Sequence, residues 1–126
     1  MRHIGPSVEI GADVSAVWDL LAGFEHWPRW GPTVRAVRSE ATGVAEGVGG
    51  RLQTVIGVWL PFEITEVVPQ RSWDWKVAGI PATRHFLDPI GERRTRARFT
   101  VAWPAAPYAV ILWIGLRRLK TMAEAA

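Results

Sequence analysis

Three histidines, His3, His26 and His85, are the side chains of this 126-residue chain with the widest range of chemistry. They lie in separate segments without the HxxxH or HExxH spacing of a metal site. The absence of cysteine also excludes thiolate chemistry and a cysteine-ligated zinc ion. We therefore predict no metal and no cofactor. A histidine on an apolar surface can still hydrogen-bond a ligand or act as a general base near neutral pH.

Among the three, His85 is the strongest candidate for such a role. His3 lies near the N-terminus, and we expect His26 on the solvent side of a short helix rich in tryptophan. The strand around His85 carries apolar residues on both faces, so alternation alone leaves its direction open.

The most basic segment, RRTRAR at residues 93–98, begins at a hairpin turn and continues into a strand. Arg96 and Arg98 alternate with Ala97 and Phe99, which is typical of a strand with one solvated and one buried face. We therefore predict that these arginines lie on the outside of a sheet and that nucleic acid is not a partner. The glycine-rich GVGG at 47–50 lacks the Lys-Ser/Thr pair of a phosphate-binding loop.

The first third of the chain predicts a strand, two helices and a second strand. Residues 8–10 alternate as a strand, and Asp13 can cap a helix over 14–22 whose apolar residues recur every three to four positions. A short second helix over 24–30 ends at Gly31-Pro32, and a strand follows at 34–38.

The remainder predicts strands joined by short turns, and therefore antiparallel neighbours. No alternation of strands and helices suggests a dinucleotide-binding fold. The expected strands are 51–59, 62–68, 71–77, 83–88 and 95–103, with an edge or turn at Leu60-Pro61 and turns at 79–81 and 89–91. A terminal helix is expected over 105–126.

The longest apolar run, Tyr108 to Leu116, has nine residues, about half of what a membrane-spanning helix needs. We predict no membrane span. The N-terminus lacks the apolar stretch of a signal peptide, so a cytoplasmic protein is expected.

Several motifs in their order and spacing resemble the SRPBCC (START-like, helix-grip) superfamily, and within it the polyketide cyclase/dehydrase family. These are the strand-helix-helix-strand opening with its tryptophan pair, TEVVPQRSWDW, the HFLDP turn and the terminal LRRLKTMAEA. The resemblance implies an α+β helix-grip fold in one domain of residues 1–126. In that fold a curved antiparallel β-sheet wraps around a C-terminal helix, and two short helices follow the first strand.

Members of the family carry a cavity between the sheet and the terminal helix, where they bind lipids, sterols or polyketides. The family's pattern places His85 inward, and strand alternation adds further wall residues. The predicted ligand-binding residues are Trp30, Trp73, Trp75, Thr83, His85, Leu87, Phe99, Val101, Trp103 and Tyr108. The alternative for any single tryptophan is plain core, and for His85 a core position satisfied by the hydroxyl of Thr83 or Tyr108.

The function expected from these features is non-covalent binding of a small hydrophobic or aromatic ligand. One alternative is a polyketide cyclase/dehydrase in which His85, helped by Arg51 or Tyr108, assists proton transfer. Another is a protein-interaction module of toxin-antitoxin or stress-response type. The sequence does not identify the ligand.

Two prolines, Pro104 and Pro107, shorten the terminal helix at its N-terminal side, so the pocket is expected to be small, open, or completed by another subunit. Apolar residues nearly encircle that helix, which turns Val110, Trp113 and Ile114 partly outward. We predict a homodimer through Trp113. The alternative is that Trp113 folds back over the sheet edge of its own chain.

Overall fold

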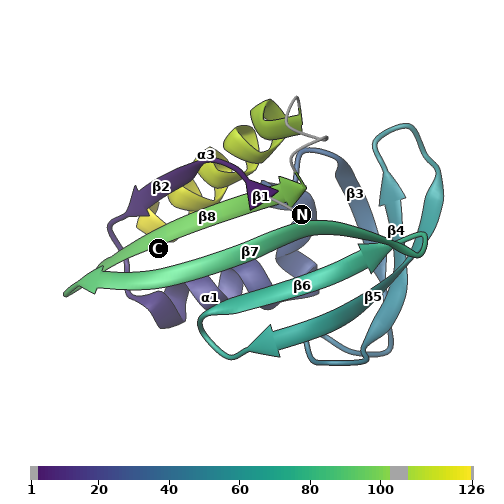
Figure 1. Ribbon diagram of the computed structural model, residues 1–126, viewed down its shortest axis with the longest axis horizontal. Coiled ribbons are helices and arrows are strands. Elements are labelled where there is room, and N and C mark those ends of the chain that lie inside the picture. Colours follow the sequence, from purple (N-terminus) through teal and green to yellow (C-terminus); the bar gives the residue numbers. More distant parts are fainter. Residues whose placement is uncertain (1–2, 103–107, 126) are drawn as a thin grey trace.

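The protein is built on an antiparallel sheet that curves around its helices (Figure 1). The computed structural model describes residues 3–102 and 108–125, so the predicted site residue Trp103 lies outside the described residues. The strands lie in the order β1-β8-β7-β6-β5-β4-β3, and β2 pairs with β8 beside β1. Their bounds are β1 His3–Ile4, β2 Ser7–Ile10, β3 Val34–Arg38, β4 Gly49–Thr54, β5 Trp59–Val68, β6 Ser72–Val77, β7 Ile80–Gly91 and β8 Arg94–Ala102.

The helices lie on one face of this sheet, behind it in Figure 1. They are α1 Val14–Ala22, the 3₁₀ turn η1 Phe24–His26, α2 Trp27–Trp30 and the C-terminal α3 Ala109–Ala125. Helix α3 packs against β2, β8, α1 and α2. The predicted α+β helix-grip architecture is therefore confirmed.

Helices α1 and α2 are tied together by tryptophan side chains. Trp27 Nε1 donates to the carbonyl oxygen of Leu21 at 2.9 Å, and Trp30 Nε1 donates to that of Leu20, also at 2.9 Å. Asp13 precedes α1 as predicted, but its side chain makes no capping hydrogen bond. The buried Val17 and Leu21 hold α1 through its apolar face, so packing supplies what the missing cap does not.

The sequence predicts an edge or turn at Leu60-Pro61 after a strand over 51–59, and the structure has no turn there. The chain turns between β4 and β5 instead, where Gly57 has φ +89° and its N–H donates to the carbonyl of Thr54 at 2.8 Å. That backbone conformation suits glycine and few other residues. Pro61 lies within β5, opposite Arg51 of β4.

Strand β7 is longer than the predicted 83–88 because its flanking prolines do not end it. Ala78 and Gly79 take positive φ values of 52° and 78°, which makes a tight turn matched to the strand twist. The strand therefore resumes at Ile80, and Pro81 pairs with Lys76. Pro89 lies at the other end, where the pairing with β8 shifts register.

The outward residues of β8 and α3 follow the predicted patterns. Arg96 and Arg98 are exposed, whereas Ala97 and Phe99 between and beside them are buried. On α3, Trp113 is 41% exposed and its ring lies 5.6 Å from the guanidinium of Arg117 in the same helix. No described helix is long and apolar enough to cross a membrane.

Candidate ligand-binding site

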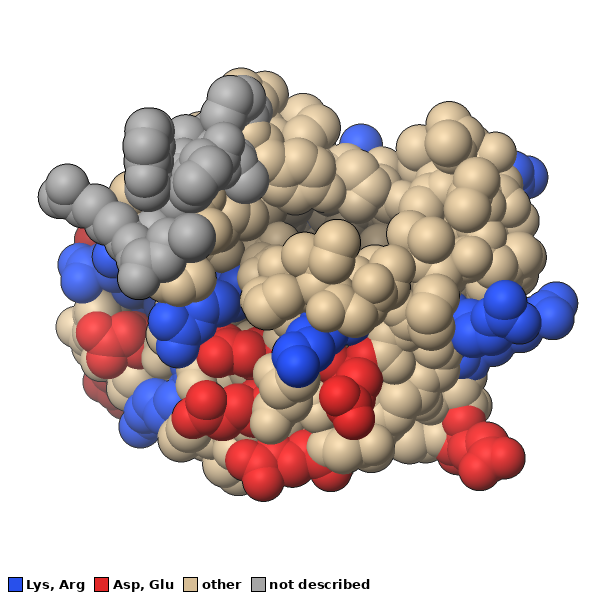
Figure 2. Space-filling model, turned by 45° about the vertical axis from the view of Figure 1, so that its right-hand side comes forward, with Lys and Arg blue, Asp and Glu red and all other residues tan. Residues whose placement is uncertain are grey.

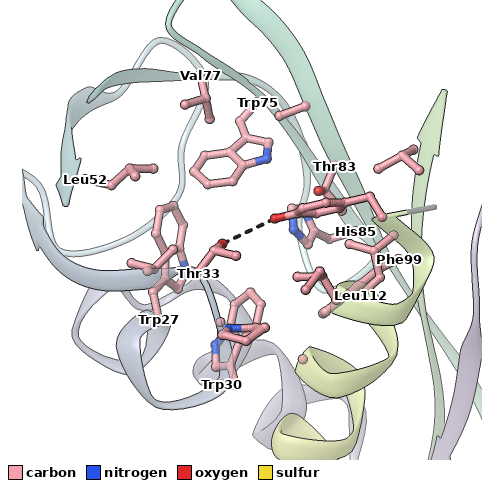
Figure 3. A pocket seen from close by; sticks show the side chains of 18 of the residues that line it. Trp27, Trp30, Thr33, Leu52, Trp75, Val77, Thr83, His85, Phe99 and Leu112 are labelled. Atoms are coloured by element: carbon pink, nitrogen blue, oxygen red, sulfur yellow. Dashed lines mark hydrogen bonds between the residues drawn. The ribbon is translucent and has the colours of Figure 1, made fainter. Parts of the chain in front are cut away.

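A cavity of about 410 Å³ lies between the concave face of the sheet, α2 and the N-terminal half of α3 (Figure 3). Strands β4 to β8 form one wall, and α2 with the segment before β3 forms the other. The predicted residues that line it are Trp30, Trp73, Trp75, Thr83, His85, Phe99, Val101 and Tyr108.

One predicted ligand-binding residue, Leu87, does not line the cavity. Leu87 shares the inward face of β7 but is not among the residues that line the cavity; it is 3% exposed and belongs to the hydrophobic core. The reason is position along the strand, because β7 also packs against α1, which fills the concave face at that end.

The cavity also contains residues that the sequence analysis did not select, notably Trp27, Thr33 and Leu52. Trp27 carried a signal, since it shares the apolar side of the second helix with Trp30. Leu52 lies between Arg51 and Gln53 in β4, and this alternation is the signal that could have identified it. Thr33 lies in a loop, where no periodicity identifies the direction of a side chain.

His85 sits in an aromatic stack at the back of the cavity. Its ring lies 3.7 Å from that of Trp73 with an interplanar angle of 20°, and Trp73 in turn stacks on Trp27 at 5.0 Å and 8°. Phe99 meets the imidazole edge-on at 4.9 Å. His85 is only 2% exposed. The ring is therefore held in one orientation by neighbours on β6, β8 and α2.

Burial lowers the pKa of His85 from 6.5 to about 3, because the charged imidazolium would lose its hydration, and the hydrogen bond to Trp73 only partly offsets this. The ring is thus neutral at physiological pH. Its Nδ1 lies 3.2 Å from the carbonyl oxygen of Trp73. A carbonyl oxygen can only accept, so Nδ1 carries the proton and Nε2 carries a lone pair.

The partner of His85 is thus a main-chain carbonyl, not the hydroxyl of Thr83 or Tyr108 considered from the sequence. Nε2 has no hydrogen-bond partner in the described part of the chain. Because the ring lines the cavity, Nε2 is the atom through which His85 can accept a hydrogen bond from a ligand.

The four described tryptophans that line the cavity differ in how their indole N–H groups are satisfied. Those of Trp27 and Trp30 donate to carbonyls of α1, whereas those of Trp73 and Trp75 are buried and have no partner among the described residues. Figure 3 shows the nitrogen of Trp75 on the side of the ring toward Thr83 and His85. An unpaired buried donor costs about 1–3 kcal/mol. Both nitrogens are closed to solvent, so an acceptor would reach them only if the rings shift.

At the mouth of the cavity, the Thr33 hydroxyl lies 3.3 Å from that of Tyr108, which joins the segment before β3 to the beginning of α3 (Figure 3). Pro81 and Ala82 at the start of β7 form another part of the cavity mouth. Tyr108 is 39% exposed, so the opening lies on this side.

The described lining of the cavity includes no lysine, arginine, aspartate or glutamate. Arg51, considered above as a helper of His85, is exposed on β4 and does not reach it. In the part of the chain that is described, no group of three histidine or carboxylate side chains is placed to hold a metal ion.

Comparison with known proteins gives a family and a fold. A family model for polyketide cyclase / dehydrase and lipid transport matches residues 1–125. A crystal structure of a protein from Mesorhizobium loti has a TM-score of 0.76 at 13% identity, over 99% of this chain and 98% of that one. The Aha1 dimer from Colwellia psychrerythraea gives 0.71 at 20% identity, over 98% and 97%.

The di-domain ARO/CYC BexL from the BE-7585A biosynthetic pathway gives a TM-score of 0.72 at 18% identity, over 96% of this chain and 46% of that one. At such identities these likenesses establish the fold alone. No curated protein sequence matches the chain.

Proposed function

The chain belongs to the polyketide cyclase/dehydrase and lipid transport family, and from that premise we propose that it binds a small, flat, largely apolar ligand non-covalently. The observation that carries the proposal is the cavity itself. Its volume of about 410 Å³ lies within the range of small-molecule sites, and its described walls are aromatic and aliphatic. Large rigid rings such as Trp30, Trp73 and Trp75 can border a hollow without collapsing into it.

Two kinds of polar atom would orient that ligand. The lone pair of His85 Nε2 accepts a hydrogen bond. The indole N–H groups of Trp73 and Trp75, which are closed to solvent in the structure, would donate once a small shift of the rings opens them to the ligand. A ligand that carries a hydroxyl group for Nε2 and a carbonyl oxygen for an indole N–H satisfies both. The ligand class that fits best is therefore an aromatic or polyene molecule with few oxygen atoms, one of them a hydroxyl.

The binding test is titration calorimetry with fatty acids, sterols and aromatic polyketide mimics, supported by quenching of tryptophan fluorescence. We expect affinities in the micromolar range. The absence of heat and of quenching with every member of this panel would overturn the proposal.

The orientation test compares 1-naphthol with naphthalene, which differ by one hydroxyl. His85→Phe should weaken binding of 1-naphthol by about 2- to 12-fold, the equivalent of a hydrogen bond of about 0.5–1.5 kcal/mol, and spare naphthalene. Trp30→Phe is the matched control, because its indole N–H already donates to Leu20 and is not offered to the ligand. An equal loss for both ligands in His85→Phe would contradict the role of Nε2.

A cyclase/dehydrase is the second candidate, and it is favoured by the family and by a histidine in the cavity wall. Two observations weigh against it. The lowered pKa makes His85 a weak proton acceptor, and the described cavity wall offers no carboxylate or cation as its partner in acid-base catalysis. Incubation with a linear poly-β-ketone mimic, followed by mass spectrometry for loss of water, tests this candidate.

The homodimer through α3 is a further part of the proposal. Val110, 65% exposed, lies one turn before Trp113 on the same outward side of an uncharged helical segment. Pairing these two side chains with those of a second copy would remove both from water. Light scattering should show a dimer that Trp113→Asp converts to monomer. A wild-type monomer at high micromolar concentration would refute it.

A further inference from the structure

Exposed apolar side chains gather at the mouth of the cavity. Among the described residues, the exposed large hydrophobic ones are Val55, Ile56, Val58, Val68, Ile80, Tyr108, Val110 and Trp113. Of these, Val55, Ile56 and Val58 form the turn between β4 and β5, Ile80 begins β7, and Tyr108 precedes α3. We call these five residues the apolar rim.

The apolar rim borders the opening, because its residues are followed or preceded in the sequence by residues that line the cavity. Thr54 and Leu60, which flank the β4–β5 turn, both line the cavity. Pro81, which follows Ile80, lines it too, as does Tyr108 itself. Three segments far apart in the sequence therefore bring apolar side chains to one opening.

The rim is also free of charge. No lysine, arginine, aspartate or glutamate occurs between Thr54 and Pro61, between Val77 and Thr83, or between Tyr108 and Leu116. In Figure 2 the acidic side chains and many of the basic ones gather on the lower part of this face, and most of the described surface that borders the hollow above them is uncharged. Ile56, at the tip of its turn, is 83% exposed. A β-turn in water ordinarily carries polar residues, so this composition indicates a partner.

We propose that the apolar rim docks onto the surface of a lipid bilayer, with the cavity mouth facing the membrane. The rim consists of separate turn tips around an opening, a shape suited to insertion between lipid headgroups. A protein seated there would close the cavity. Apolar side chains at the tips with a tyrosine beside them match the chemistry of the membrane interface.

Docking in this orientation would let an apolar ligand pass between bilayer and cavity without crossing water. Membrane docking does not depend on the proposed ligand binding; only this passage of a ligand between bilayer and cavity rests on the proposed function. The net charge of +3 adds attraction to anionic lipids, but the apolar tips predict that neutral vesicles are bound as well.

The test is flotation of the protein with phosphatidylcholine vesicles, neutral or containing phosphatidylglycerol. Ile56→Asp and Ile80→Asp should each reduce the fraction bound to neutral vesicles at least tenfold. The structure offers a matched pair, because Val58 in the rim and Val68 at the far end of β5 are 46% and 45% exposed. Val58→Asp should weaken binding severalfold, whereas Val68→Asp should leave it within twofold of the wild type.

Several outcomes would overturn the proposal. They are a wild-type protein that floats with neither vesicle, an equal loss in Val58→Asp and Val68→Asp, and binding to anionic vesicles that salt abolishes but Ile56→Asp does not. A larger species that Ile56→Asp converts to monomer would mean that a second copy covers the rim.

Calorimetry with the ligand panel separates this proposal from the previous one. Ile56 does not line the cavity, so Ile56→Asp should keep the wild-type ligand affinity while losing vesicle binding. Vesicle binding by a wild-type protein that binds no ligand would refute the ligand proposal alone.

Discussion

The two ends of the concave face are built from the same sheet but differ in what covers them. At the closed end, α1 lies on β7 and β8 and α3 lies on β2 and β8. The core residues Val17, Leu21, Leu116 and Leu119 are 0% exposed. At the open end, α2 and the first turns of α3 leave a cavity of about 410 Å³ over β4 to β8.

Hydrogen bonding of buried polar groups also differs between the closed and the open end. At the closed end, Thr95 Oγ1 donates to the carbonyl of Ala12 at 2.8 Å, and the carboxylate of Glu124 accepts from the main-chain N–H of Gly11 at 2.7 Å. At the open end, the indole N–H groups of Trp73 and Trp75 have no partner among the described residues. The closed end therefore supplies stability, which lets the open end keep an unfilled, incompletely satisfied surface for binding.

The largest expected effect contrasts two leucines of α3. Leu119→Ala should lower the unfolding free energy by about 2–5 kcal/mol, because Leu119 is 0% exposed at the closed end and the substitution opens a new cavity in a packed core. Leu112→Ala should lower the unfolding free energy less, because Leu112 already lines the cavity and its removal enlarges an existing hollow. Urea denaturation measures both. Equal losses would contradict the division between the two ends.

A pH titration of stability should single out the open end. His85 has a pKa of about 3 when folded and about 6.5 when unfolded, so below pH 6.5 the unfolded chain binds a proton that the folded protein does not. The stability that neutral His85 contributes is complete above pH 6.5 and decreases as the pH falls toward 3. Between pH 7 and 4.5 the loss should be about 2–3 kcal/mol.

The matching variant is His85→Phe, compared with itself at the two pH values so that any uniform loss of stability cancels. Between pH 7 and 4.5, the unfolding free energy of His85→Phe should fall by about 2–3 kcal/mol less than that of the wild type. His26→Gln, which alters a histidine outside the cavity, serves as the control. An unchanged acid loss in His85→Phe would show that burial of His85 does not shape the pH profile.

The smallest expected effect compares two buried threonines of β8. Thr95→Val removes the hydroxyl that satisfies the Ala12 carbonyl and should destabilise the protein by about 1 kcal/mol. The Thr100 hydroxyl is buried without a partner among the described residues, so Thr100→Val should be neutral or slightly stabilising. Thermal unfolding distinguishes the two variants, and equal destabilisation would argue against the hydrogen-bond assignment.

Local patterns predicted much of this fold correctly. Helix α1, the strand Val34–Arg38 and the outward direction of Arg96 and Arg98 follow from periodicity, which a single segment contains. Errors came where two local signals competed. Leu60-Pro61 reads as an edge or turn, yet the turn forms at Gly57, inside the predicted strand 51–59, and Pro61 is accommodated within β5.

Residue types and alternation determined which side chains face inward on strands such as 72–77 and 95–102. The inward direction of His85 came from the family's pattern, because alternation left it open. Only the tertiary structure decided their chemistry. Whether an indole N–H is satisfied, which proton His85 keeps and how far its pKa falls depend on neighbours from other elements, such as the Trp73 carbonyl of β6. Desolvation and hydrogen bonding are properties of the assembled environment, and no spacing along one strand encodes them.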